Sequence, residues 1–323
     1  MALSNMKVFN REVQTATIET VAQMVDKFNA ASAGAITLTA QGFEGDYRYE
    51  NFWQGIHSAQ RRVDRYAANS AASSTALAQL QEIGVKVAGG FGPILWEPGQ
   101  LTWVQKNPGE AVEVISRNLA EAIIKDQLNT AIAAACAAIE AGTTNTTYDA
   151  GTSVLSYRHI NRAHALFGDH SQLLVADVMD GTSFHNLIDA NLANEATLFQ
   201  AGNVRVVDIL GRRVVVTDAP ALRESPSTTT NDAKILSLVA GGIVVYDGSD
   251  LITNVETNNG KLRIETTFQA DYTFGLALKG YQWDTTTGGK SPTDAELATG
   301  GNWDKVATSW KHTAGVITLY ETK

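Results

Sequence analysis

The sequence has a single cysteine, Cys136, among its 323 residues. One thiol excludes an internal disulfide framework and the usual multi-cysteine zinc sites, and it is typical of a protein made in a reducing cytoplasm. Charged residues are also scarce at 18%, and the 34 acidic residues outnumber the 25 basic ones, which leaves a net charge of −9. This balance disfavours a protein whose main task is to grip nucleic acid, because phosphate binding needs clustered lysine and arginine.

Long apolar runs are missing too. No segment approaches the ~20 consecutive apolar residues that a membrane span requires, and the first residues lack the basic stretch and apolar run of a secretory signal. The hydrophobic share of 44% is that of an ordinary globular protein. We therefore expect a soluble protein of about two lobes, made in the cytoplasm and without a membrane partner.

The N-terminal third predicts an arm followed by extended segments. Apolar residues at helical spacing predict one amphipathic helix over residues 8–32. Large apolar and charged residues alternate over residues 43–53, which predicts an exposed strand or hairpin with one face in need of a partner. The Ala- and Ser-rich residues 67–82 predict a short helix, and residues 85–88 and 94–97 predict two strands separated by a flexible break.

The clearest predicted element is a long helix over residues 108–141. Asn107 is its expected N-cap, Pro108 fits the first helical position, and Glu110 can complete a capping box. Apolar residues then recur every three or four positions until Gly142 supplies the stop. The helix would be about 50 Å long. A coiled coil is the alternative, but the pattern is not a sustained leucine heptad.

The second half of the chain predicts mixed α/β structure. Asn259-Gly260 is the preferred two-residue hairpin turn, because both of its positions need positive φ. Beyond a Thr/Asn/Gly linker, we expect helices over residues 153–167, 184–192 and 292–297, and strands over residues 173–176, 204–209, 214–217, 235–239, 243–245, 251–257, 261–268, 274–281 and 316–320.

Sequence motifs with a possible chemistry are weak. Gly288-Gly289-Lys290-Ser291 resembles the end of a phosphate-binding loop, but the first glycine of that motif is replaced by Asp284 and Pro292 interrupts the helix that should follow. Cys136, within an Ala-rich helix, is better explained as a small core residue than as a nucleophile. Six scattered tryptophans favour cores and interfaces over ligand stacking.

Histidines provide no convincing site either. His159, His164 and His170 do not share the i, i+4 spacing of a metal pair on one helical face. Asp169-His170-Ser171 has the residue types of a hydrolase triad, but adjacent residues cannot form the required relay. We therefore predict no catalytic, metal or cofactor site, and not an enzyme.

Four segments carry a resemblance to a known family: residues 42–48 (Gly-Phe-Glu-Gly-Asp-Tyr-Arg), 61–67 (Arg-Arg-Val-Asp-Arg-Tyr-Ala), 126–135 and 207–218. Together with the order of elements, they resemble the major capsid proteins of tailed bacteriophages, which have the Hong Kong 97-type fold. The resemblance implies an α+β protein with five segments: an N-terminal arm (1–34), a region with the extended (E) loop and strands of the peripheral (P) domain (35–101), the P domain with its spine helix 108–141 (102–152), the axial (A) domain (153–265), and a return to the P domain with a C-terminal tail (266–323).

The resemblance also implies the function. The chain would assemble with itself into pentamers and hexamers of an icosahedral head that encloses double-stranded DNA. Other implied partners are a separate scaffolding protein, a portal, decoration proteins and non-specifically contacted DNA; the short arm leaves no room for a fused scaffold. The implied location is the virion, with assembly in the host cytoplasm. An encapsulin-like compartment shell and an enzyme with a cryptic site are the alternatives.

Candidate assembly contacts follow from the predicted extended segment. Burial against a neighbouring subunit would remove the aggregation hazard of an exposed aromatic strand. The three arginines near residue 62 could face packaged DNA or pair with Glu44, Asp46 or Glu50 of a neighbour. The nine candidates are Phe43, Asp46, Tyr47, Arg48, Phe52, Trp53, Arg61, Arg62 and Arg65.

Overall fold

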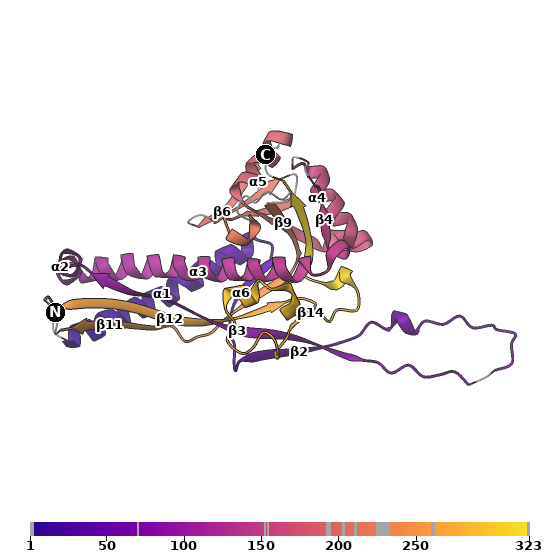
Figure 1. Cartoon of the computed structure of the whole chain (residues 1–323), viewed down its shortest axis with the longest axis horizontal. Helices are drawn as coiled ribbons and strands as arrows, with labels where there is room; N and C mark the ends of the chain where they lie inside the picture. The colour runs from indigo at the N-terminus through magenta and orange to yellow at the C-terminus, as the bar shows by residue number, and fades with distance from the viewer. Residues whose placement is uncertain are drawn as a thin grey trace.

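The computed structural model describes residues 3–69, 71–151, 153, 155–191, 195–201, 204–209, 212–223, 233–259 and 262–321. Figure 1 shows one long helix, α3 (Pro108–Glu140), lying between a lower sheet and an upper lobe, while a thin hairpin loop projects sideways from the lower sheet. Helices and strands are both abundant and are not regularly alternating along the chain. The predicted α+β class is confirmed.

The lower sheet has eight strands. Their order is β1 (Ile36–Gly42), β10 (Ile243–Asp247), β12 (Glu265–Leu278), β3 (Gln79–Trp96), β13 (Tyr281–Trp283) and β14 (Trp303–Lys305), with β2 (Tyr47–Trp53) on β3 and β11 (Ile252–Asn258) on β12. The β12–β3 ladder is antiparallel and runs from Thr266↔Trp96 to Leu276↔Val85. These two long strands form the centre of the sheet.

The upper lobe holds the second sheet, of seven strands. Their order is β4 (Thr147–Asp149), β15 (Gly315–Tyr320), β9 (Ala233–Val239), β5 (Leu174–Met179), β8 (Arg212–Val216), β7 (Val204–Ile209) and β6 (Glu195–Ala201). Helices α4 (Tyr157–His164) and α5 (Gly181–Asn191) complete the lobe. Buried apolar residues such as Met179, Phe184 and Ile235 form its core.

The two sheets do not coincide with the predicted segments of the chain, because some strands of one segment pair into the sheet expected for another. β10 and β11 fall within the predicted A segment 153–265, but both pair with β12 in the lower sheet. β15 falls within the predicted return to the P domain, but it pairs with β9 and β4 in the upper sheet. Sequence order could not reveal these pairings, because backbone hydrogen bonds join strands that are distant along the chain.

Helix α3 supplies much of the core between the two sheets. Its Ala-rich second half is buried, and Ala131, Ala134, Ala135 and Ala138 are fully covered. Small side chains let neighbouring backbone approach closely, as Gly300 does beside the carbonyl of Ala137. Among the described residues α3 is also the helix with the length and hydropathy to cross a membrane, but 61% of its most apolar window is buried within the protein.

The ends of α3 differ in detail from the prediction. Asn107 is the N-cap and Pro108 the first helical residue, but the Asn107 side chain makes no cap hydrogen bond. Gly142 has an ordinary negative φ, and the positive φ falls on Thr143 instead. A larger residue would not fit at position 142, because a Cβ there would overlap Thr146 and Trp310.

The N-terminal helix α1 (Leu3–Ala31) packs on α3 and covers the outer edge of β11. The side-chain amides of Asn10 and Gln14 donate to the carbonyls of Thr253 and Leu251, with the Asn10 bond at 2.5 Å. An uncovered strand edge can pair with strands of other chains. The two side-chain amides occupy two of the carbonyls at this edge. Phe9 and Val13 anchor the start of α1 against α2 (Pro98–Lys106) and α3.

The flexible break predicted between the two strand pieces of β3 is wrong. The two short strands and their glycine-rich break are one continuous 18-residue strand. Gly89, Gly90 and Gly92 do not break it because the β12 ladder holds the backbone, with a register shift that absorbs the local irregularity. A Cβ at Gly89 would meet the ring of Tyr272, so close packing explains that glycine.

Candidate assembly interface

The projecting hairpin is built from β2 and the first part of β3. The two strands pair antiparallel from Tyr47↔Val85 to Trp53↔Gln79. One further hydrogen bond, from the Gln54 amide to the Ala78 carbonyl at 2.9 Å, closes the ladder. Beyond it the chain forms a wide loop, here called the distal loop (residues 54–78), that extends far from the body (Figure 1).

The distal loop contains a short 3₁₀ turn at Ile56–Ala59 and otherwise no regular structure among its described residues. The helix predicted over residues 67–82 is wrong. A short helix needs an apolar face packed on something to be stable in water, and the Ala- and Ser-rich residues have no such surface to contact. Residues 79–82 instead belong to β3, where β2 is their partner.

The distal loop exposes large apolar side chains. Ile56 is 70% exposed, Val63 69% and Tyr66 90%. Holding such side chains in water on an extended loop is unfavourable, and burying each against a partner would contribute roughly 1.5–3 kcal/mol. Within the described ranges of the subunit these three side chains remain exposed.

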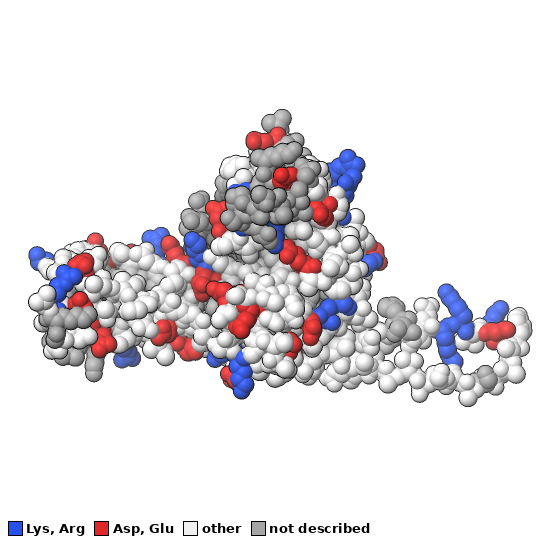
Figure 2. Space-filling view, in the orientation of Figure 1, with Lys and Arg blue, Asp and Glu red and all other residues white. Residues whose placement is uncertain are grey.

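The distal loop is also basic. It carries Arg61, Arg62 and Arg65 against a single acidic residue, Asp64, in a chain whose net charge is −9. All three arginines are exposed, and Figure 2 shows their positive charge at the far end of the loop. Arg65 lies over the ring of Tyr66 at 5.7 Å. The predicted arginine contacts thus lie where a second molecule can reach them.

The predicted contacts at the base of the hairpin are used within the subunit. Phe43 is only 3% exposed; its ring lies 5.8 Å from that of Tyr246 and covers Gly275. It therefore packs in the subunit's own core, which differs from the predicted contact with a neighbour. The sequence could not reveal this, because the glycine that makes room for Phe43 lies on a distant strand.

Arg48 and Asp46 also have partners in the same chain. The Arg48 guanidinium lies 2.8 Å from Glu50 and 4.2 Å over the Tyr246 ring. The Tyr246 hydroxyl donates to Glu50 at 3.1 Å, and burial raises the pKa of Tyr246 to about 12. Asp46 lies 3.6 Å from Lys290.

The remaining aromatic candidates differ in exposure. Tyr47 is half-buried and packs against the main core. Phe52 is half-buried as well, whereas Trp53 is 64% exposed at the start of the distal loop. Trp53 is therefore the aromatic residue of this strand that is most available to a second molecule.

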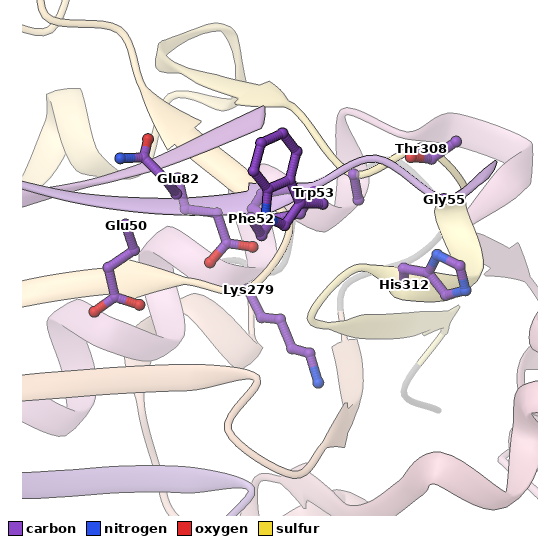
Figure 3. A pocket seen from close by; sticks show the side chains of 10 residues that line it. Glu50, Phe52, Trp53, Gly55, Glu82, Lys279, Thr308 and His312 are labelled. Carbon is purple, nitrogen blue, oxygen red and sulfur yellow. The ribbon is translucent and has the colours of Figure 1, made fainter. Parts of the chain in front are cut away.

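A pocket of about 480 Å³ lies at the base of the hairpin, which we call the hinge pocket. One wall is the hairpin, with Glu50, Trp53 and Glu82; the other is formed by Lys279 and the C-terminal loop at Thr308 and His312 (Figure 3). Sequence reasoning missed this pocket because its two walls come from opposite ends of the chain.

Two carboxylates share the hairpin wall of the hinge pocket. Glu50 and Glu82 are directly opposite in the β2–β3 ladder, so their side chains lie on the same face. Glu82 accepts a hydrogen bond from the Gly280 amide at 2.6 Å. Burial raises the pKa of Glu82, and the charge of Glu50 adds to this effect. Like charges at opposite positions destabilise a strand pair, so the arrangement is costly in the free subunit.

Residues considered for chemistry have structural roles. His164 is buried, and its Nε2 lies 3.2 Å from Asp177 and 3.0 Å from Ser237. A catalytic relay uses both ring nitrogens, and here both partners share one. Cys136 is buried, and burial raises the pKa of its thiol to about 12. Within the described ranges no cluster of His, Cys, Asp and Glu is arranged to hold a metal ion.

Comparison with known proteins gives one family and several distant structural similarities. A model of the family described as major capsid protein 13-like matches residues 5–317. No curated protein matches. The similar solved structures include the capsid asymmetric unit of cyanophage Pam1 (9% identity, 88% of each chain, TM-score 0.48), a protein of Mycobacterium phage Ogopogo (14%, 74% of this chain and 86% of that one, 0.47) and one of Microbacterium phage Oxtober96 (13%, 91% of each, 0.45). Because these identities and TM-scores are low, the assignment of the chain to a family rests on the family model alone.

The subunit thus combines a long helix between two sheets with a projecting hairpin that exposes apolar side chains. The chain belongs to the major capsid protein 13-like family. This match confirms the predicted phage major capsid protein, a structural protein of the head shell, and does not favour the encapsulin-like alternative.

Proposed function

We propose that the chain assembles with copies of itself into hexamers and pentamers of an icosahedral phage head that encloses double-stranded DNA, and that the distal loop is a principal contact between subunits. The observation that carries this proposal is the exposure of Ile56, Val63 and Tyr66 on a loop that projects from the body of the subunit. Specific interfaces bury apolar anchors of this kind.

The proposed partners follow from this role. A separate scaffolding protein guides assembly, a portal occupies one vertex, and decoration proteins attach to the finished shell. Contact with packaged DNA is non-specific, in keeping with the net negative charge of the chain. The protein is located in the virion and is assembled in the host cytoplasm. In domain terms, α3 is the P-domain spine, the hairpin is the E loop and the upper lobe is the A domain.

The test compares particle formation by the full chain and by a variant with a shortened loop. Replacing residues 55–77 by Asn-Gly joins Gln54 to Ala78, which already face each other across the ladder. The full chain, expressed with the scaffolding protein, is expected to form closed particles in negative-stain microscopy. The shortened variant is expected to remain folded, by circular dichroism, but unassembled.

A matched control changes the same loop without removing its apolar anchors. Ala71→Ser and Ala72→Ser alter exposed small residues and are expected to leave particle yield unchanged. Equal particle yield from the shortened variant would refute the role of the distal loop. Nuclease-protected double-stranded DNA in particles from infected cells is the expected content; a co-purifying enzyme in place of DNA would refute the genome-enclosing role.

A further inference from the structure

Helix α4 presents a basic surface to solvent. The helix has eight residues, none of them acidic, in a chain whose net charge is −9. Ile160 and Ala163 are buried against the upper sheet, on its face away from α3. Figure 2 shows basic side chains on the flank of the upper lobe where Figure 1 places α4. We call this surface the α4 face; its exposed residues are Arg158, Asn161 and Arg162.

The two arginines of the α4 face have no carboxylate partner in the described part of the chain. Arg162 donates to the Tyr148 hydroxyl of β4 at 2.8 Å, and Arg158 has no ion pair. Burial lowers the pKa of His159, the charges of Arg162 and Arg158 lower it further, and no carboxylate opposes them. The positive charge is therefore not balanced by groups beside it.

The acidic residues nearest to α4 along the chain are bonded elsewhere. Asp149 accepts a hydrogen bond from the Gly151 amide at 2.6 Å. Asp169 lies 2.6 Å from the Lys311 ammonium, whose hydrogen bond lowers the pKa of Asp169. Each of these carboxylates thus has a partner other than an arginine of the α4 face.

The placement of the arginines is unfavourable for the helix itself. Arg158 and Arg162 are four residues apart, so two like charges are neighbours on one side of α4. Arg158 also lies in the first turn, where the positive end of the helix dipole disfavours a cation. An anion bound at both guanidinium groups would offset both effects.

The chemistry of the α4 face fits a phosphate backbone better than a protein surface. No residue of α4 is among the exposed large apolar side chains of the described chain, whereas specific protein interfaces are built around such anchors. Arginine side chains and neutral polar side chains are the usual phosphate contacts. The Tyr148 ring stacks on His159 at 6.3 Å, and its hydroxyl holds the Arg162 guanidinium in place.

We propose that the α4 face binds the phosphate backbone of the packaged double-stranded DNA, with the guanidinium groups of Arg158 and Arg162 on phosphate oxygens. This inference rests on the proposed genome-enclosing function and names the surface that meets the genome. The contact does not depend on base sequence, because both groups act on phosphate. In a chain of net charge −9, such a local cluster also determines which side of the upper lobe can approach DNA.

The experiment measures the affinity of the full, unassembled chain for a labelled DNA duplex by fluorescence anisotropy, between about 50 and 200 mM salt. The logarithm of affinity falls with the logarithm of salt concentration with a slope of about −0.9 for each phosphate contacted. Arg158→Ala combined with Arg162→Ala is expected to make this slope shallower by about 1.8 and to lower the affinity at low salt at least about tenfold. Arg158→Lys combined with Arg162→Lys keeps both charges and is expected to retain most of the slope.

The matched control is Arg117→Ala combined with Lys125→Ala, which removes two exposed cations from α3 and changes the net charge equally. This control is expected to keep the slope of the unmodified chain. A slope unchanged by the alanine variant of the α4 face, or changed equally by the control, would overturn the assignment. Loss of particle formation with unchanged duplex affinity would also overturn it, because the α4 face would then contact another protein. Particles from infected cells that contain no DNA would instead overturn the genome-enclosing function, whatever the duplex affinity.

Discussion

Phe43 and Gly275 form a contact whose energy can be isolated by a double-mutant cycle. The Phe43 ring covers Gly275 so closely that a Cβ at this glycine would overlap the ring. Gly275 is paired with Tyr246 across β10 and β12, and the Tyr246 ring lies beside Phe43, so the ring of Phe43 cannot move aside freely. Gly275→Ala is therefore expected to destabilise the subunit by about 2–3 kcal/mol, the upper part of the range for overpacking.

Phe43→Ala removes a buried aromatic side chain and is expected to cost about 3–5 kcal/mol. In the double variant the methyl group introduced by Gly275→Ala would occupy space vacated by the ring. We therefore expect Gly275→Ala to cost less than about 0.5 kcal/mol in the Phe43→Ala background. The coupling energy would be at least about 1.5 kcal/mol, within the range for residues in contact.

The assay is guanidinium unfolding followed by tryptophan fluorescence, in the shortened-loop background so that assembly does not contribute. Gly275→Ala is expected to lower the unfolding midpoint when Phe43 is present and to leave it nearly unchanged in the Phe43→Ala variant. Additive costs would refute the packing explanation. A destabilisation by Phe43→Ala of less than about 1 kcal/mol, well under the range for a buried aromatic ring, would refute the buried role of this ring and favour the contact with a neighbour instead.

Three further predictions concern a helix end, a thiol and a carboxylate. Gly109→Ala, at an exposed position in the first turn of α3 with no atom near the added Cβ, is expected to stabilise the subunit by about 0.5–1 kcal/mol in the same unfolding assay; a loss of stability would contradict this. Cys136, with its thiol pKa raised to about 12, is expected to resist a thiol reagent at pH 8 until the chain is unfolded, so rapid native labelling would argue against its burial. Burial raises the folded-state pKa of Glu82, so its contribution to stability is greatest below the ordinary value of 4.5 and is lost as pH rises through the raised pKa. Glu82→Gln should therefore raise the unfolding midpoint of the unassembled subunit at pH 7 but not at pH 4, and an equal effect at both would refute the assigned cause.

Local sequence patterns determined the parts of this protein that depend on neighbouring residues. The 3–4 residue apolar spacing and Pro108 set α3 almost to its observed bounds, and the alternating aromatic segment was correctly predicted as extended. Family resemblance in the same text indicated a major capsid protein. The arginine run at residues 61–65 was visible in the sequence, and its three arginines are exposed on the distal loop.

Tertiary structure decided what depends on distant partners. The β12 ladder made one strand of the glycine-rich β3, and the open distal loop left the Ala-rich residues after Arg65 without a surface on which to form a helix. Gly275 turned Phe43 from a candidate contact into a core residue, and the C-terminal loop at Thr308 created the hinge pocket. In each case the deciding contact joins segments far apart in the chain, so periodicity and composition contain no record of it.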